Sequence, residues 1–457
     1  MYSRCKVAAS CTSQGRERLI RGRRGAPAAP VLGGLALACL LAGGAQGFQD
    51  ERADLGRPFE RFVEPSVPGR PRPDPTEVPI GIITSSDADY ESRVSGALLA
   101  VEQANEKGGW HGRPFALWSR PSRGGTLASP WLSAADNARD LIHRFDCLGL
   151  IAAPDRNVSH LLAQMAFRSH TPMVSLSYDS ALTRIPHPWL VRIVPDTRTQ
   201  LEALVRSLAI PPTGPIPALL PPGREGRSVR ADLASMGPLL GVAFEPLVDY
   251  EHEVEVAAAR ALEGLEADGA RPLLVWLDKE MAAQALAQLE RIGWKGPVLL
   301  PHHLFEGVRK RIEPPPGLEC RAVQVFDTHS DDPRAAAFIQ AYRNGFGVLP
   351  DEAAACAFDA TNLLLEAIRG AGCDRSAIRA WLATLGEYEG ITGRIRFDGT
   401  GNRQQVWPVK IVSGGGAPVP PAAGPAARAG DGSSGADRPQ DPPPQGPDPP
   451  GAPRREP

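Results

Sequence analysis

Residues 78–114 read VPIGIITSSDADYESRVSGALLAVEQANEKGGWHGRP, and this stretch decides the fold. The first seven residues form an apolar run that is typical of a buried strand. After a polar segment, apolar residues recur at helical spacing, at Val94, Leu98, Val101 and Ala104. Gly108 and Gly109 predict the end of that helix, and residues 115–118 form a second apolar run. The stretch therefore predicts one strand-helix-strand unit.

The same alternation continues to residue 412. Further apolar runs that predict strands lie at residues 147–153, 172–176, 189–194, 217–220, 242–248, 272–277, 297–300 and 317–326. Helical patterns lie at residues 132–144, 158–169, 197–208, 229–236, 253–267, 280–292, 333–346, 351–370 and 376–385. Such alternation predicts mostly parallel sheets covered by helices. Because one sheet of this many strands would be unusually large, we expect two lobes.

The last part of the pattern has a different character. Residues 391–397 and 406–412 are apolar runs on either side of the turn sequence Asp398-Gly-Thr-Gly-Asn402. Two such runs around a glycine-containing turn predict a β-hairpin.

The N-terminal end has the composition of a targeting segment. Residues 1–47 carry seven basic residues and one Glu, an apolar run at residues 31–42, and then the small residues Ala45 and Gly47. The run is shorter than the ~20 residues that span a bilayer, so we predict a signal peptide cleaved after Gly47 and an exported, periplasmic or extracytoplasmic protein. Lipid anchoring at Cys39 is less favoured, because the preceding Ala36-Leu-Ala38 is a poor lipoprotein box.

Two further segments have compositions that disfavour folding. Residues 48–77 are rich in Pro, Arg and acidic residues, and residues 413–457 are rich in Pro and Gly. We expect a disordered linker and a disordered tail.

Charge and cysteine content limit the possible partners and cross-links. Because residues 1–47 carry six net positive charges, their removal takes the formal charge from −2 to about −8, which argues against nucleic acid as a partner. The helical pattern between Cys356 and Cys373 would hold them ~25 Å apart, too far for a disulfide. A bridge between Cys147 and Cys320 has no support, and buried free thiols are the favoured interpretation.

The opening stretch resembles the first part of type I periplasmic binding proteins of the leucine/isoleucine/valine-binding class. The matching positions are Gly96, Ala97, Ala100, Val101, Asn105, Gly108, Gly109, Gly112, Arg113 and Pro114. A closing signature is also similar, with Phe358-Asp-Ala360, Leu364-Leu-Glu-Ala-Ile368, Gly390-Ile-Thr-Gly-Arg-Ile-Arg-Phe-Asp398 and Gly401-Asn-Arg403. The resemblance extends over residues 78–412.

The resemblance implies an α/β fold with two doubly wound, mostly parallel-sheet lobes joined by three crossovers. We assign residues 78–195 and 328–388 to lobe 1, and residues 196–327 and 389–412 to lobe 2. The crossings should fall near residues 194–196, 326–329 and 387–390. On the same basis we expect a monomer that closes by hinge motion on a small polar ligand, an amino acid or a related amide or carboxylate, and delivers it to a membrane ABC permease.

Loops that follow strands are the expected ligand sites in such sheets. The resemblance implies that the loops after the third and fourth strands hold the ligand. Where the family shows Gly-Pro-x-Ser-Ser, this chain has Ala153, Pro154, Asp155, Arg156 and Asn157. Arg156 could clamp an anion, or Asp155 or Asn157 could simply cap the next helix while Arg156 is solvated.

The loop after the fourth strand is closer to the family pattern. It reads Ser175-Leu-Ser177-Tyr178-Asp179, in which Ser175 and Ser177 could bind a carboxylate. Ser177 and Tyr178 are the favoured residues of the ligand cleft. Asp179 stands where the family has a hydroxyl residue. It could accept a hydrogen bond from an ammonium or amide group, or it could repel a carboxylate.

Three more residues align with ligand contacts of the family: Tyr90 in the first loop, and Asp278 and His303 after strands of the second lobe. Tyr90 could line the ligand pocket or only pack. Residues 221–226 carry prolines, glycines and charge where the family often has a tyrosine. The sequence therefore predicts the fold more firmly than the ligand.

No motif of an enzyme is present, neither a nucleophile elbow, a zinc-protease helix nor a phosphate-binding loop. His302-His303 is a poor metal-site candidate, since adjacent histidines on one loop point apart. We expect a non-enzymatic binding protein without a cofactor. Two alternatives remain, a ligand-sensing receptor module and a ligand-free interaction protein of the same fold.

Overall fold

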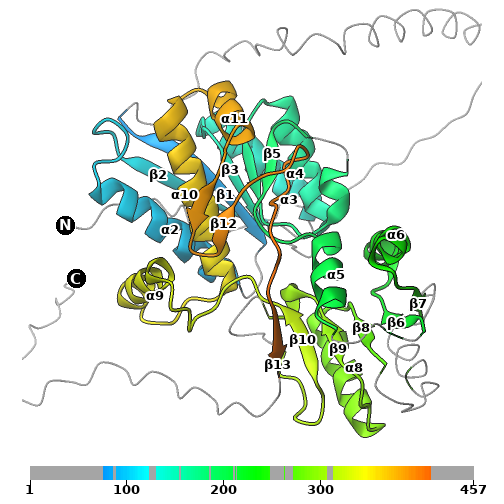
Figure 1. Ribbon diagram of the computed structural model, residues 1–457. Coiled ribbons are helices and arrows are strands. Elements are labelled where there is room, and N and C mark those ends of the chain that lie inside the picture. Colours follow the sequence, from blue (N-terminus) through cyan, green and yellow to red (C-terminus); the bar gives the residue numbers. More distant parts are fainter. Residues whose placement is uncertain are drawn as a thin grey trace, which may run out of the picture. The chain divides into compact units, whose positions relative to one another are not determined.

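In the computed structural model (Figure 1), the described residues are 76–85, 89–122, 130–153, 156–184, 187–208, 212, 214–247, 262, 271–305 and 312–412. Of residues 121–122, 130–132 and 156–157 only the backbone is described. The predicted signal peptide and tail lie outside these ranges. Of the predicted linker only Thr76 and Glu77 are described, and of the predicted helix at residues 253–267 only Leu262.

The first sheet has five parallel strands in the order β2-β1-β3-β4-β5 (Figure 1). They are β1 (Val78–Ser85), β2 (Phe115–Ser122), β3 (Leu150–Ala153), β4 (Met173–Ser175) and β5 (Leu190–Arg192). The order grows outward from β1 on both sides, which confirms the predicted doubly wound arrangement.

Helices cover both faces of this sheet. They are α2 (Tyr90–Glu106), α3 (Pro130–Arg139) with the π-helical turn η2 (Asp140–Arg144), α4 (Arg156–Arg168), the 3-10 turn η3 (Ser180–Thr183), α10 (Glu352–Ala371) and α11 (Arg375–Ala383). Ile82 packs in the core that includes Leu364 of α10, whereas the next residue, Ile83, packs in the core of Ala134 and Leu162 on α3 and α4. Because neighbouring residues of a strand point to opposite faces, both faces of the sheet are buried.

The second sheet has six strands in the order β13-β10-β9-β8-β6-β7. They are β6 (Ile216–Leu219), β7 (Phe244–Pro246), β8 (Leu273–Val275), β9 (Val298–Leu300), β10 (Cys320–Val323) and β13 (Val409–Val412). All neighbours are parallel except β10 and β13, which are antiparallel. The helical elements of this part are α5 (Thr197–Arg206), α6 (Gly223–Leu240), α8 (Lys279–Arg291) and the 3-10 turn η4 (His302–Leu304).

The chain passes between the two sheets three times. It leaves the first sheet after β5 and returns after β10 through α9 (Pro333–Phe346), which contacts α2. It leaves again after α11 through the short antiparallel pair β11 (Tyr388–Gly390) and β12 (Gly393–Ile395), and then enters the second sheet as β13. The structure thus has the expected fold class with three crossovers, while the residue limits assigned to each lobe stay a prediction.

The predicted C-terminal hairpin is wrong. The turn at residues 398–402 exists, with an antiparallel bridge between Phe397 and Arg403, but the flanking runs pair elsewhere. β12 pairs with β11, and β13 pairs with β10 and becomes the edge strand of the second sheet. Without β13, one edge of β10 would leave its backbone N–H and C=O groups unpaired. Pairing of residues 409–412 with β10 satisfies these groups, and a hairpin with β12 would not.

Two other predictions need correction. The helix predicted at residues 229–236 is longer and begins at Gly223, so the segment that replaces the family tyrosine is partly helical. Tyr90 is the first residue of α2 and does not lie in a loop. Most other predicted elements are found within a few residues of their predicted ends.

Gly96 and Asn105 of the opening signature each meet a structural requirement. A Cβ atom at Gly96 would lie 2.1 Å from the carbonyl oxygen of Ala354, because α2 and α10 cross there at close range. The Asn105 side chain accepts from the Phe115 backbone N–H at 2.7 Å and donates to its carbonyl at 3.0 Å. It thereby joins the end of α2 to the start of β2.

Candidate functional site

Loops from the carboxyl ends of strands in both sheets meet at Tyr178 and His303. Tyr178 follows β4 of the first sheet, and His303 lies in η4, directly after β9 of the second. The two rings are stacked, with centroids 4.8 Å apart and planes inclined by 10°. Tyr178 also meets the ring of His302 edge-on at 5.6 Å. Two of the predicted ligand residues, from different sheets, are therefore in direct contact.

The loop after β4 is tightly organised. Ser175 is buried, and its hydroxyl oxygen accepts from the Ser177 N–H at 3.2 Å. Ser177 is buried too, and its hydroxyl oxygen accepts from the Asp179 N–H at 3.4 Å. Both hydroxyl oxygens therefore shape the backbone of this loop by accepting hydrogen bonds from it.

Asp179 is held by groups of the protein. Its carboxylate accepts from His160 Nε2 at 3.0 Å and from the Ala181 N–H at 3.0 Å, which caps η3. It also accepts from the Ser228 hydroxyl of α6 at 3.4 Å. These partners give the carboxylate a structural role, and the positively polarised donors around it reduce its repulsion of a nearby anion.

Arg192 holds the backbone of the same loop through buried hydrogen bonds. We did not predict this role from the sequence. Its fully buried guanidinium donates to the carbonyls of Ser177 at 3.1 Å and Asp179 at 2.6 Å, and forms an ion pair with Asp196 at 3.5 Å. Burial lowers the pKa of Arg192, and the charge of Asp196 opposes this shift. The available signal was an arginine in the middle of the apolar run at residues 189–194, because a buried charge needs dedicated partners.

The β1 loop and the start of α8 also meet. Lys279 Nζ lies 3.7 Å from a carboxylate oxygen of Asp89, and Arg93 Nη2 lies 3.9 Å from the same oxygen. Tyr90, which follows Asp89, places its hydroxyl oxygen 2.9 Å from that of Ser119 on β2. Tyr90 is thus held against its own sheet, and two cations accompany the acid beside it.

Asp278 and His303 have clear local partners. Asp278 is exposed and caps α8 by accepting from the Met281 N–H at 2.8 Å. His303 Nε2 donates to the Leu277 carbonyl at 3.0 Å, which fixes the ring against Tyr178. Asp278 therefore acts as a helix cap, while His303 presents an aromatic face.

The remaining predicted residues belong to the loop after β3. Arg156 and Asn157 form the first turn of α4, but their side chains are not described, and Asp155 lies outside the described residues. Their proposed contact with a ligand stays a prediction.

Other features of the described residues bear on the chemistry. No three His, Cys, Asp or Glu side chains in the described ranges come together as a metal site. Cys147, Cys320 and Cys356 are buried free thiols, and Cys373 is an exposed one. In the part of the chain that the structure describes, no helix combines the length and apolar character needed to cross a membrane.

A sequence profile of the family described as periplasmic binding protein matches residues 77–416, nearly the whole described part of the chain. The chain belongs to the periplasmic binding protein family. This confirms the resemblance seen in the opening and closing signatures of the sequence. No curated protein sequence matches the chain significantly.

Solved structures agree with this assignment. This periplasmic binding protein is similar to an ABC transporter substrate-binding protein from Desulfitobacterium hafniense in complex with Leu, with a TM-score of 0.61 and 19% identity over 74% of this chain and 98% of that one. LivJ of Streptococcus pneumoniae in complex with isoleucine gives 0.58 and 18% over 74% and 99%. A solute-binding protein of R. palustris in complex with benzoate gives 0.59 and 16% over 74% and 94%. At these identities the similarity establishes the fold.

Proposed function

We propose that this periplasmic binding protein captures a small carboxylate-bearing ligand between the strand-end loops of its two sheets. The observation that carries the proposal is the stacking of Tyr178 on His303, because it brings together loops from both sheets at the carboxyl ends of their strands. A ligand that inserts beside this contact would touch both lobes and stabilise their closure.

The chemistry of the surroundings supports a carboxylate. Lys279 and Arg93 both lie within 4 Å of the Asp89 carboxylate, which places cationic side chains beside the start of α2. The ligands named for three similar structures, leucine, isoleucine and benzoate, all carry a carboxylate. Amino acids and related amides or carboxylates are therefore the ligand class that we propose.

The biological role that we propose is delivery of the ligand to a membrane ABC permease, without chemical conversion. We propose an exported protein, processed after Gly47, that acts as a monomer. A receptor module of the same fold would bind ligand equally well, but would not stimulate transport by a permease.

Thermal-shift screening of the mature protein tests this function. Amino acids, their amides and small carboxylates should be compared at concentrations up to about 1000 times the Kd expected for a specific ligand, where stabilisation reaches about 4 kcal/mol. The expected result is stabilisation by at least one compound of this class. A folded protein that none of these compounds stabilises would favour the third possibility, an interaction protein that binds no ligand.

Transport assays then separate delivery from sensing. The ligand found by screening, radiolabelled, should accumulate in vesicles that contain the permease only when this protein is added. Light scattering of the same preparation gives the oligomeric state, and N-terminal sequencing of the exported chain gives the cleavage site.

A further inference from the structure

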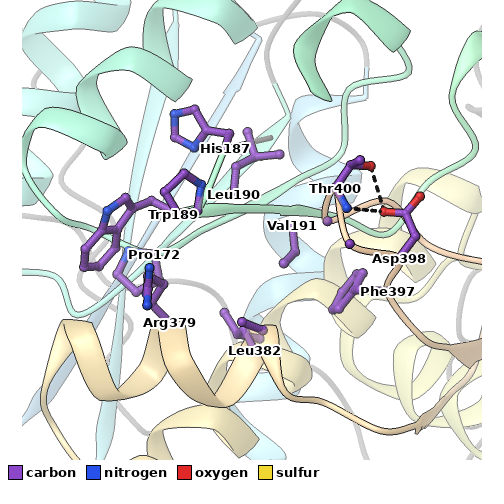
Figure 2. Close-up of a pocket in the computed structure, with 14 residues that line it drawn as sticks. Pro172, His187, Trp189, Leu190, Val191, Arg379, Leu382, Phe397, Asp398 and Thr400 are labelled. Carbon is purple, nitrogen blue, oxygen red and sulfur yellow. Dashed lines mark hydrogen bonds between the residues drawn. The ribbon is translucent and has the colours of Figure 1, made fainter. Parts of the chain in front are cut away.

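A cavity of about 290 Å³ lies beside the start of β5 (Figure 2). Its walls come from residues around the start of β5, from the end of α11 and from the turn at residues 397–401. The strand-end loops described above follow the carboxyl ends of the strands, whereas this cavity opens where β5 begins. It is therefore a different site from the one between the loops.

The cavity has apolar walls and one cationic group. Val191, Leu382 and Phe397 supply the apolar surface, and Figure 2 shows Leu382 and Phe397 on either side of the space below Val191. The guanidinium of Arg379 lies 5.4 Å from the ring of Trp189. Within the described part of the chain, no acidic side chain forms an ion pair with Arg379.

The opposite wall holds an acid that is already satisfied. One carboxylate oxygen of Asp398 accepts from the Thr400 N–H at 2.8 Å and the Thr400 hydroxyl at 2.7 Å (Figure 2). The same oxygen accepts from the Asn402 N–H at 2.9 Å. These bonds fix the turn, and the Asp398 carboxylate is stabilised by donors of the protein itself. Arg379 is therefore the ionic group best placed to select a ligand.

Trp189 adds a buried polar group to the wall of the cavity. Its side chain is 5% exposed, and its indole N–H has no hydrogen-bond partner among the described residues. A buried donor without a partner costs about 1–3 kcal/mol, which a polar group of a bound molecule would recover.

We propose that this cavity is a second small-molecule site, which binds a carboxylate with a ring or branched apolar body. The body would pack between Leu382 and Phe397, and the carboxylate would pair with Arg379. The volume is at the lower end of that of ligand pockets, about 300–1000 Å³, so it suits a single ring or a short branched chain.

The wall of this cavity is bonded to the loop after β4. Asn402 ends the turn, and its side-chain oxygen accepts from Arg192 Nη2 at 2.6 Å. Arg192 in turn donates to the carbonyls of Ser177 and Asp179. An occupant that presses on the turn would therefore alter the β4 loop through two side chains, and linkage requires the effect to act in both directions.

Titration with 3-phenylpropanoate and 4-methylpentanoate, followed by NMR of the full mature chain, tests the site. The indole N–H signal of Trp189, assigned with Trp189→Phe, should shift saturably with at least one probe. Arg379→Gln should weaken that probe about tenfold, as expected for the loss of one charge-assisted pair. The corresponding amide should bind wild type and Arg379→Gln with equal, weaker affinity.

Two matched variants of α11 locate the binding. Ala383→Trp places a large side chain at an exposed position that lines the cavity, and should abolish the Trp189 shift. Ala380→Trp adds the same side chain at an exposed position of α11 that does not line it, and should bind as wild type does. A shift that persists in Ala383→Trp, an affinity unchanged by Arg379→Gln, or no saturable shift with either probe would overturn the proposal.

The link to the β4 loop has its own readout. The backbone amide signal of Ser177 should shift with the same saturation curve as Trp189, and a Ser177 signal that does not move would overturn the coupling. These signals report on this cavity even if screening finds no ligand between the loops. Conversely, thermal stabilisation that survives Ala383→Trp belongs to the site between the loops, so the two proposals can fail separately.

Discussion

The fully buried guanidinium of Arg192 donates to the side-chain oxygen of Asn402 through Nη2 at 2.6 Å and through Nε at 3.0 Å, and so joins β5 to a turn 210 residues later in the chain. Asn402 belongs to the closing signature of the sequence. Its position explains why an amide is suited there, since a buried arginine needs an acceptor and Asn supplies one without a second charge.

We expect Asn402→Ala to lower the free energy of unfolding by about 2 kcal/mol, because a hydrogen bond to a buried charge is lost. Urea unfolding followed by circular dichroism measures the change. Asn344→Ala is the matched control, since among the described residues the exposed side chain of Asn344 on α9 bonds only to Gln340, and the substitution should change stability by less than about 0.5 kcal/mol. Equal effects of the two substitutions would contradict the role given to Asn402.

A second prediction concerns the crossing of α2 and α10. Gly96→Ala puts a methyl group 2.1 Å from the Ala354 carbonyl oxygen, so the helices must separate, and we expect a loss of about 2 kcal/mol or more. Gly345→Ala on α9 meets no atom within 4 Å and should instead stabilise by about 0.5–1 kcal/mol. Thermal unfolding of both variants should move in opposite directions. A neutral Gly96→Ala would mean that the two helices are not held at this distance.

The carboxylate of Asp232 on α6 carries a third prediction. It is fully buried, pairs with Arg198 Nε at 2.9 Å and Arg184 Nη2 at 3.3 Å, and accepts a short hydrogen bond from Ser180. Asp232→Asn keeps the shape but removes the charge that balances two arginines. We expect a loss of about 2–3 kcal/mol.

The control for Asp232→Asn is a solvent-exposed ion pair. Asp136 and Arg139 are 3.0 Å apart, yet both side chains are more than half exposed, so Asp136→Asn should cost at most about 0.5 kcal/mol. Added salt should weaken that exposed pair and leave the Asp232 cluster nearly unchanged. If Asp232→Asn is as mild as Asp136→Asn, the cluster does not hold α6 to η3.

His187, in the wall of the cavity beside β5, makes stability depend on pH. Burial lowers its pKa, so the folded chain keeps it neutral while the unfolded chain, which titrates near pH 6.5, binds a proton more readily. Stability is therefore full above about pH 6.5 and falls as the pH drops below it. His187→Gln should flatten this slope in urea unfolding between about pH 5 and 7.5, whereas substitution of the 85% exposed His329 should not. The same slope in wild type and His187→Gln would exclude His187 as its source.

The sequence predicted the fold well because the inner strands of both sheets are buried on two faces. Strands such as β1 then appear as unbroken apolar runs. They alternate with helices whose N-termini are capped by aspartates at positions 196, 278, 332, 351 and 374. The prediction of a hairpin was wrong because the apolar pattern of residues 406–412 fits the edge of any strand. Only the tertiary structure shows that β10 is the strand available for pairing.

The site could be predicted only in part. The position of the strand-end loops follows from the order of the elements, so Tyr178 and His303 were found although 125 residues separate them. The roles of individual side chains do not follow from that order. Asp179 meets His160 and Ser228, and Arg192 meets Asn402, through contacts that exist only once distant segments have packed.

Replacement of Tyr178 tests the site between the loops directly. Its ring lies parallel to that of His303, so an apolar or planar part of a ligand would pack against the same aromatic pair. With the ligand found by thermal-shift screening, we expect Tyr178→Ala to weaken binding at least tenfold, because an aromatic contact and its share of burial are lost, about 1.4 kcal/mol or more. Tyr178→Phe keeps the ring and should stay within about threefold of wild type. Calorimetric titration gives both affinities; a ligand that binds Tyr178→Ala as tightly as wild type does not use this contact, and equal weakening by Ala and Phe would show that the hydroxyl group, and not the ring, recognises the ligand.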